Sequence, residues 1–161
     1  MRKKLAIAAL LAAGLAIGPS QAQEERRTPY WASISAGKAM MRTGPGTNYP
    51  ATWLYLRADL PIKVVETYPN WRKVEDPDGE TGWMLQRLLS DRRTALVTGD
   101  EPRPMLDKPE ESGHVRYLAE PGVVGRLSNC AEGWCLLAVG EREGYIRADH
   151  FFGIDAGGTL D

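Results

Sequence analysis

The two cysteines and the two histidines are the residues of this sequence that could bind a metal or form a covalent intermediate. Cys130 and Cys135 lie five positions apart, a spacing that differs from the Cys-x-x-Cys pair of redox enzymes. His114 and His150 lie 36 positions apart, and no pair among these four side chains has zinc-ligand spacing. The sequence also has no serine elbow, phosphate loop or His-Glu-x-x-His motif. We therefore predict no catalytic residue, no metal site, no cofactor and no enzyme.

Arg42 begins the run Arg42-Thr43-Gly44-Pro45-Gly46, which has two possible interpretations. The loop could bind a ligand, with the guanidinium holding a carboxylate, for example that of a peptide stem. Alternatively it is a structural turn, in which Gly44 and Gly46 supply positive φ angles and Arg42 pairs with a nearby acid. The rigid spacing of the run favours the structural turn.

The N-terminus has the three parts of a secretory signal peptide. Three basic residues at 2–4 precede an apolar stretch at 5–17 that is too short to span a bilayer. Small residues at Ser20 and Ala22 then predict cleavage between Ala22 and Gln23. We expect a signal peptide at 1–22, a disordered N-terminus at 23–29, and a periplasmic or secreted protein with no membrane partner. The alternative is a retained membrane anchor.

Cleavage would also change the charge of the chain. The net charge of −1 loses three positive charges and becomes −4 in the predicted mature chain. No dense cluster of lysine and arginine remains, which argues against a nucleic-acid partner.

The rest of the chain predicts short strands rather than helices. Its 17 glycines and 11 prolines are spread along the sequence, as in proteins made of strands and tight turns. Expected strands in the first half are 30–35, 39–42, 53–56, 61–68, 71–75 and 81–84.

A shift of 63 positions places Trp71 on Trp134, and a shift of 62 places Gly82-Trp83 on Gly144-Tyr145. This self-similarity predicts two repeated units, at 30–92 and 93–155, followed by a tail at 156–161.

Three motifs in the first unit identify a family. Residues 41–50 follow the pattern Arg-x-Gly-Pro-Gly-x-x-Tyr-Pro, residues 71–74 follow Trp-x-x-Val, and residues 78–84 resemble an Asp-Gly-x-x-Gly-Trp-Val hairpin. Residues 32–90 thus resemble a bacterial SH3 domain. The second unit lacks the first motif but keeps the later ones. The whole chain resembles exported two-unit SH3-like proteins of Gram-negative bacteria, which implies an all-β fold of two tandem SH3-like barrels, the second degenerate.

Several large aromatic rings fall in the first unit, among them Tyr49, Trp53, Tyr55, Tyr68, Trp71 and Trp83, and a barrel of about 60 residues cannot bury all of them. Rings left at the surface could stack on prolines or sugars. Trp53 and Tyr55 are two positions apart and would share one face of a strand. We predict a ligand groove formed by Tyr49, Trp53, Tyr55 and Arg42. The alternative is that these rings form the contact between the two units.

The repeat places Cys130 and Cys135 on Thr67 and Arg72, on either side of a hairpin turn. Side chains so placed face each other across two strands, and an exported protein meets an oxidising compartment. We predict a disulfide between Cys130 and Cys135, the alternative being a reactive cysteine.

These observations favour a non-catalytic binding protein of the cell envelope. The resemblance suggests peptidoglycan or a peptide as the ligand. The alternative is a structural or assembly protein that uses the same aromatic surface for a protein partner or for self-association, and an envelope hydrolase is a third, less favoured hypothesis.

Overall fold

Short antiparallel strands are the main secondary structure in this computed structural model, which describes residues 26–155 and 158. The described part contains fourteen strands, which form two separate sheets, and two single-turn 3₁₀ helices. None of its helices is long and apolar enough to cross a membrane. The predicted signal peptide and its cleavage site at Ala22 and Gln23 lie outside the described residues.

The first sheet has the strand order β3-β2-β6-β5-β4-β1-β7. Its elements are β1 (Tyr30–Ile34), β2 (Ala39–Arg42), β3 (Ala51–Tyr55), β4 (Pro61–Tyr68), β5 (Trp71–Glu75), β6 (Thr81–Leu85), η1 (Gln86–Leu88) and β7 (Leu89–Ser90). In β4 the apolar side chains of Ile62 and Val64 are buried on either side of the partly exposed Lys63, which is the alternation expected of a strand with one face on a core.

The second sheet repeats this order as β10-β9-β13-β12-β11-β8-β14. Its elements are β8 (Thr94–Val97), β9 (Arg103–Leu106), β10 (Val115–Ala119), β11 (Val124–Ala131), β12 (Trp134–Val139), β13 (Arg142–Arg147), η2 (Ala148–His150) and β14 (Phe151–Phe152). Each strand of the first sheet therefore has a counterpart seven strands later. The predicted all-β fold of two tandem SH3-like units is confirmed.

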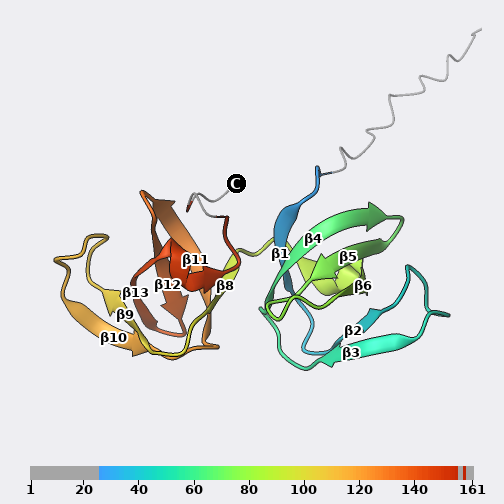
Figure 1. Cartoon of the computed structure of the whole chain (residues 1–161), viewed down its shortest axis with the longest axis horizontal. Helices are drawn as coiled ribbons and strands as arrows, with labels where there is room; N and C mark the ends of the chain where they lie inside the picture. Colours follow the sequence, from blue (N-terminus) through green and yellow to red (C-terminus); the bar gives the residue numbers. More distant parts are fainter. Residues whose placement is uncertain (1–25, 156–157, 159–161) are drawn as a thin grey trace, which may run out of the picture.

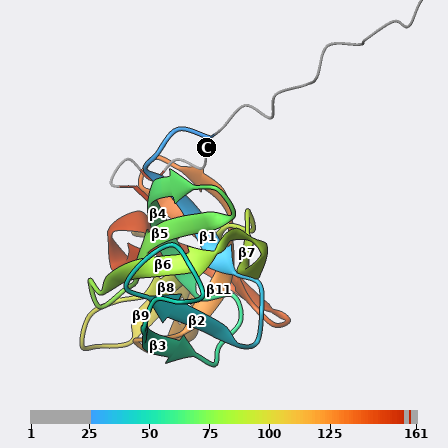
Figure 2. The ribbon, with the colours of Figure 1, turned by 90° about the vertical axis from the view of Figure 1, so that its right-hand side faces the viewer.

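Each sheet curls around its own core, and the two units lie side by side along the long axis of the molecule (Figure 1). Figure 2 looks at the first unit end-on, with β4, β5 and β6 above β2 and β3. The fully buried side chains of the first core include Ile34, Met41, Ile62, Val74 and Met84. Those of the second include Val97, Leu137 and Ile146.

Trp31 and the apolar side chains of Leu96 and Val124 contribute to the contact between the two units. The Trp31 ring packs edge-on against Phe152, with 4.9 Å between ring centroids, and its Nε1 donates a hydrogen bond to Asp155 Oδ1 at 3.0 Å. Arg57 Nη1 also donates across the contact to the carbonyl of Gly122, at 2.9 Å. Neither this ring contact nor these hydrogen bonds involve Tyr49, Trp53 or Tyr55, which the alternative interpretation would have placed between the units.

Candidate functional site

The Arg42 loop is held together by its own contacts. Arg42 Nη1 donates to the carbonyl oxygen of Tyr49 at 2.7 Å, and the backbone N–H of Thr43 donates to the carbonyl of Pro50 at 3.0 Å. The expected acidic partner of Arg42 is therefore replaced by a backbone carbonyl. This bond closes the loop, and a part for Arg42 in ligand binding stays a prediction.

The glycines of this loop are needed for a reason that the sequence did not suggest. Neither Gly44 nor Gly46 has a positive φ, so the predicted need for left-handed backbone is wrong. Instead, the ring of Tyr49 packs against both residues. A Cβ on Gly44 would collide with the ring, and a Cβ on Gly46 would lie 2.5 Å from Asn48 Oδ1 and 3.2 Å from the Tyr49 ring.

Trp53 and Tyr55, two positions apart on β3, both reach the turn between β5 and β6. Trp53 Nε1 donates to Glu80 Oε2 at 3.4 Å, and the Tyr55 hydroxyl donates to Asp76 Oδ2 at 2.7 Å. The two rings differ in exposure: Trp53 is 51% exposed, whereas Tyr55 is half-buried against the first core. Burial, followed by the hydrogen bond to Asp76, raises the pKa of Tyr55 well above its ordinary value.

Asp76 explains why Tyr55 is held in this position. The carboxylate is buried, and its Oδ1 accepts the backbone N–H groups of Asp78 at 3.0 Å and Glu80 at 2.8 Å. Tyr55 therefore braces a turn, and Trp53 is the ring of this pair that faces solvent.

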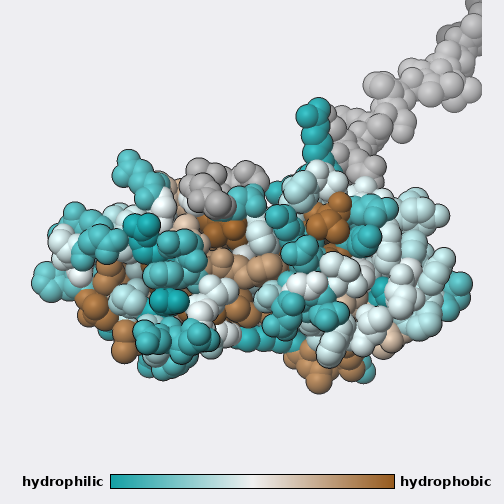
Figure 3. Space-filling view, in the orientation of Figure 1, coloured by the Kyte–Doolittle hydropathy of each residue, from teal (hydrophilic) through white to brown (hydrophobic). Residues whose placement is uncertain are grey.

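Apolar side chains are exposed at the free edge of each sheet. On and beside β3 these are Tyr49, Trp53, Leu54 and Leu56; on β10 they are Val115, Tyr117 and Leu118. Figure 3 shows apolar surface at the lower edge of both units, where these two hairpins lie. All four predicted groove residues are on the hairpin formed by β2 and β3, yet neither of the two best-formed clefts includes them among its lining residues.

An open cleft of about 900 Å³ lies on another side of the first unit. Four separate segments line it: β1, the Arg42 loop, the start of β5 and the stretch from the end of β6 to residue 91. The lining residues are Tyr30, Ala32, Gly46, Thr47, Asn48, Asn70, Trp71, Arg72, Leu85, Gln86, Arg87, Leu89, Ser90 and Asp91. The predicted groove residues are absent from this wall, although the loop that Arg42 closes contributes Gly46 to Asn48.

Arg72 brings a buried positive charge to this cleft. The side chain is 9% exposed; its Nε donates to the Tyr30 hydroxyl at 3.2 Å and its Nη1 to the carbonyls of Tyr68 and Trp71 at 3.0 and 2.7 Å. Within the described residues no carboxylate forms an ion pair with it. A buried guanidinium held by neutral acceptors is suited to attract an anionic group of a ligand.

The rim of the cleft carries further charges. Arg87 is exposed on η1. Arg26 lies over the Tyr30 ring, 4.5 Å from its centroid, and its Nη1 is 3.5 Å from Asp91 Oδ1. The cleft thus combines aromatic walls, amide groups and more positive than negative side chains.

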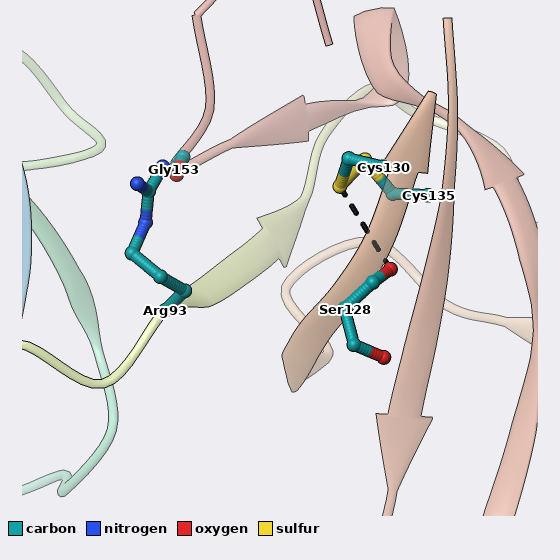
Figure 4. Close-up of a disulfide and its surroundings, with 5 residues drawn as sticks. All are labelled: Arg93, Ser128, Cys130, Cys135 and Gly153. Carbon is teal, nitrogen blue, oxygen red and sulfur yellow. Dashed lines mark hydrogen bonds between the residues drawn. A yellow bond between two sulfur atoms is a disulfide. The ribbon is translucent and has the colours of Figure 1, made fainter. Parts of the chain in front are cut away.

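The second unit differs at the position of Arg72. Cys135 stands there and forms a disulfide with Cys130, with the two Cα atoms 4.1 Å apart (Figure 4). The predicted disulfide is confirmed. The first unit shows the matching geometry, because Thr67 and Arg72 are paired across β4 and β5.

The histidines give no sign of a metal centre. His114 is exposed, with its Nδ1 3.7 Å from Asp107 Oδ2, whereas burial and then the charge of Arg103 lower the pKa of His150. In the part of the chain that the structure describes, no group of three His, Cys, Asp or Glu side chains could hold a metal ion.

Some solved structures resemble this chain distantly. The chain is similar to solved structures of an NlpC/P60 family protein from Bacillus cereus ATCC 10987 (13% identity, 76% of this chain and 56% of that one, TM-score 0.35) and of NlpC1 from Trichomonas vaginalis (15% identity, 81% and 48%, TM-score 0.33). It spans about half the length of these proteins. No curated protein was found to match.

The family model described as "Bacterial SH3 domain" matches residues 35–91 and 99–150, one match in each sheet. These matches cover most of the chain and coincide with the two repeated strand orders. The chain therefore belongs to the bacterial SH3 domain family.

Proposed function

We propose that this protein is a non-catalytic binding protein of the cell envelope, whose first unit recognises peptidoglycan or a peptide through the cleft beside Arg72. The observation that carries this proposal is the buried guanidinium, which has no carboxylate partner among the described residues, at the wall of an open cleft of about 900 Å³. Membership of the bacterial SH3 domain family is consistent with a binding role.

The chemistry of the cleft fits a ligand with a peptide chain and a carboxylate. Arg72 and Arg87 offer charge-assisted hydrogen bonds to a carboxylate. The side-chain amides of Asn48, Asn70 and Gln86 offer both donors and acceptors to a peptide backbone. Tyr30 and Trp71 supply apolar surface on which a small side chain or a sugar ring could pack.

The proposed location rests on two observations. The disulfide between Cys130 and Cys135 favours an oxidising compartment over the cytosol. The signal-peptide pattern at 1–22 accounts for transport to that compartment. We infer that the mature chain works in the periplasm or outside the cell.

The exposed edge at β3 supports a second candidate function. Trp53, Leu54 and Leu56 are 51%, 45% and 72% exposed on or next to an edge strand, and exposed edges readily pair with another chain. This favours the alternative of an assembly protein whose β3 edge meets a protein partner or a second copy.

A binding experiment with matched variants separates these functions. Mature protein is mixed with purified peptidoglycan, and the bound fraction is measured after centrifugation. Arg87→Ala removes an exposed cleft charge, Arg116→Ala removes an exposed arginine of β10 as a control, and Trp53→Ala removes the exposed ring of β3. All three are expected to leave the melting temperature nearly unchanged, because the side chains are exposed.

Loss of binding with Arg87→Ala and retention with Arg116→Ala is the expected result. Loss with Trp53→Ala alone would move the site to the predicted groove. A wild-type chain that fails to bind either peptidoglycan or its peptide fragments would overturn the proposed ligand. If sedimentation then showed a self-associated wild type that Trp53→Ala dissociates, the assembly function would replace it.

A further inference from the structure

The two units share the backbone that forms the floor of the cleft. In the first unit the N–H of Gln86 donates to the carbonyl of Asn70 at 2.9 Å, and both residues line the open cleft. In the second unit the N–H of Ala148 donates to the carbonyl of Gly133 at 2.8 Å. Gly133 and Ala148 are therefore the structural counterparts of Asn70 and Gln86.

The chain takes different paths after the last strand of each unit. After β7 it continues through residues 91–93 into β8. After β14 it folds back over its own unit, and Ile154 becomes part of the second core with 7% exposure. Gly158 is buried, and a Cβ placed on it would lie 3.1 Å from the Cβ of Ala148 and 3.2 Å from the Cα of Gly133. Gly158 thus covers the counterpart of the open cleft floor.

Specific contacts hold this C-terminal segment, by which we mean residues 153–155 and 158. Arg93, just before β8, reaches toward Gly153, with its Nη2 3.5 Å from the Gly153 carbonyl oxygen (Figure 4). Asp155 accepts the indole N–H of Trp31, and its own carbonyl accepts the N–H of Gly158 at 2.9 Å. The segment therefore contacts both units.

The residues beneath the segment are those expected of a covered surface. Asn70 and Gln86 are exposed polar residues in the first unit. Their counterparts are a glycine and an alanine, and Ala148 is only 6% exposed. Replacement of polar side chains by small ones lets a backbone approach closely without leaving buried polar groups unpaired.

We propose that the second unit contains a peptide-binding groove whose ligand is the C-terminal segment of the same chain. The groove takes a peptide with an aliphatic residue for the second core, supplied by Ile154, and a glycine over Gly133 and Ala148, supplied by Gly158. The first unit keeps the same floor open for an external ligand, while the second is occupied from within.

The first test removes the segment and returns it as a separate molecule. A mature chain that ends at Phe152 is labelled with ¹⁵N and titrated with a synthetic peptide of residues 153–161. The expected result is saturable shifts of the Gly133 and Ala148 amides and of the Trp31 indole N–H, with no saturable shift from a scrambled peptide. A truncated chain that is folded but gives no such shifts at millimolar peptide would overturn the proposal.

The second test keeps the chain at full length, in case truncation prevents folding. Gly158→Val adds a side chain at a backbone φ of +62°, where the added Cβ would lie 3.1 Å from its nearest neighbour. Gly140→Val is the matched control, because its φ is +61° but nothing lies within 4 Å of the added Cβ. Carboxypeptidase should remove residues up to and beyond position 158 about tenfold faster from Gly158→Val than from wild type or Gly140→Val. The reason is that the protease cleaves the C-terminal segment only when the segment has detached from the second unit, and Gly158→Val favours the detached state. Equal trimming of all three proteins contradicts the proposal. Neither test involves peptidoglycan or the first cleft, so its failure is distinct from failure of the proposed function.

Discussion

Trp31 is predicted to join the two units into one cooperative structure. Trp31→Ala removes a side chain that is 6% exposed, together with its packing against Phe152 and its hydrogen bond to Asp155. Truncation of a buried tryptophan costs about 3 to 5 kcal/mol of unfolding free energy. Because Phe152 and Asp155 belong to the second unit, we expect most of this cost to fall on the coupling between the two units.

The assay is urea unfolding followed by circular dichroism, with Trp53→Ala as a control. The control makes the same chemical change at a ring that is 51% exposed, and is expected to cost about 1 kcal/mol or less. Wild type and control should unfold in one transition, whereas Trp31→Ala should unfold in two, as the units separate. A single transition for Trp31→Ala, shifted no further than that of the control, would refute the coupling.

Three further predictions concern the disulfide, Tyr55 and the Arg42 loop. Replacing Cys130 and Cys135 by serine should lower the unfolding free energy by only about 2 kcal/mol, because the cysteines are five positions apart and the disulfide closes a short loop. A loss of more than about 4 kcal/mol in a denaturant titration would contradict this prediction. Because the pKa of Tyr55 is raised above 10.0 in the folded chain, ionisation of this group should not affect the unfolding free energy below pH 10. Above pH 10 the unfolding free energy should fall by up to about 1.4 kcal/mol per pH unit. Tyr55→Phe should remove that pH dependence, and an unchanged dependence would argue against the contact with Asp76. Gly44→Ala should cost about 1 to 3 kcal/mol by collision with the Tyr49 ring, whereas Gly37→Ala, with nothing within 4 Å, should be nearly neutral in thermal melts; equal effects would contradict the packing.

Local patterns were sufficient to predict an all-β fold, because the alternation in β4 and the turn residues between strands are encoded within short stretches. The repeat at Trp71 and Trp134 predicted two units, and the resemblance to bacterial SH3 domains predicted that both are SH3-like. The disulfide could be predicted because the hairpin places Cys130 and Cys135 opposite each other, and that geometry depends only on neighbouring strands.

The cleft could not be predicted because its walls come from segments far apart in sequence. Arg72 is oriented by Tyr30, 42 positions away, and neither residue belongs to a motif that suggests binding. Exposed aromatic residues were the available signal, and they led to the β3 hairpin instead. The contact of Trp31 with Asp155 joins residues 124 positions apart, so local sequence patterns could not predict it either.

The glycines at 44 and 46 show a different limit of sequence patterns. The motif correctly predicted a turn, yet the reason for its glycines is the ring of Tyr49 rather than backbone conformation. A sequence pattern records that a small residue is needed and does not distinguish a steric reason from a conformational one.

The proposed cleft can be tested by an NMR titration of the ¹⁵N-labelled mature chain with soluble peptidoglycan fragments that carry a free stem carboxylate. We predict saturable shifts at the signals of Asn48, Asn70, Gln86 and Arg87, which line the cleft, and loss of these shifts in Arg87→Ala. Shifts confined to Trp53, Leu54 and Leu56, or no shifts at all, would contradict the proposal.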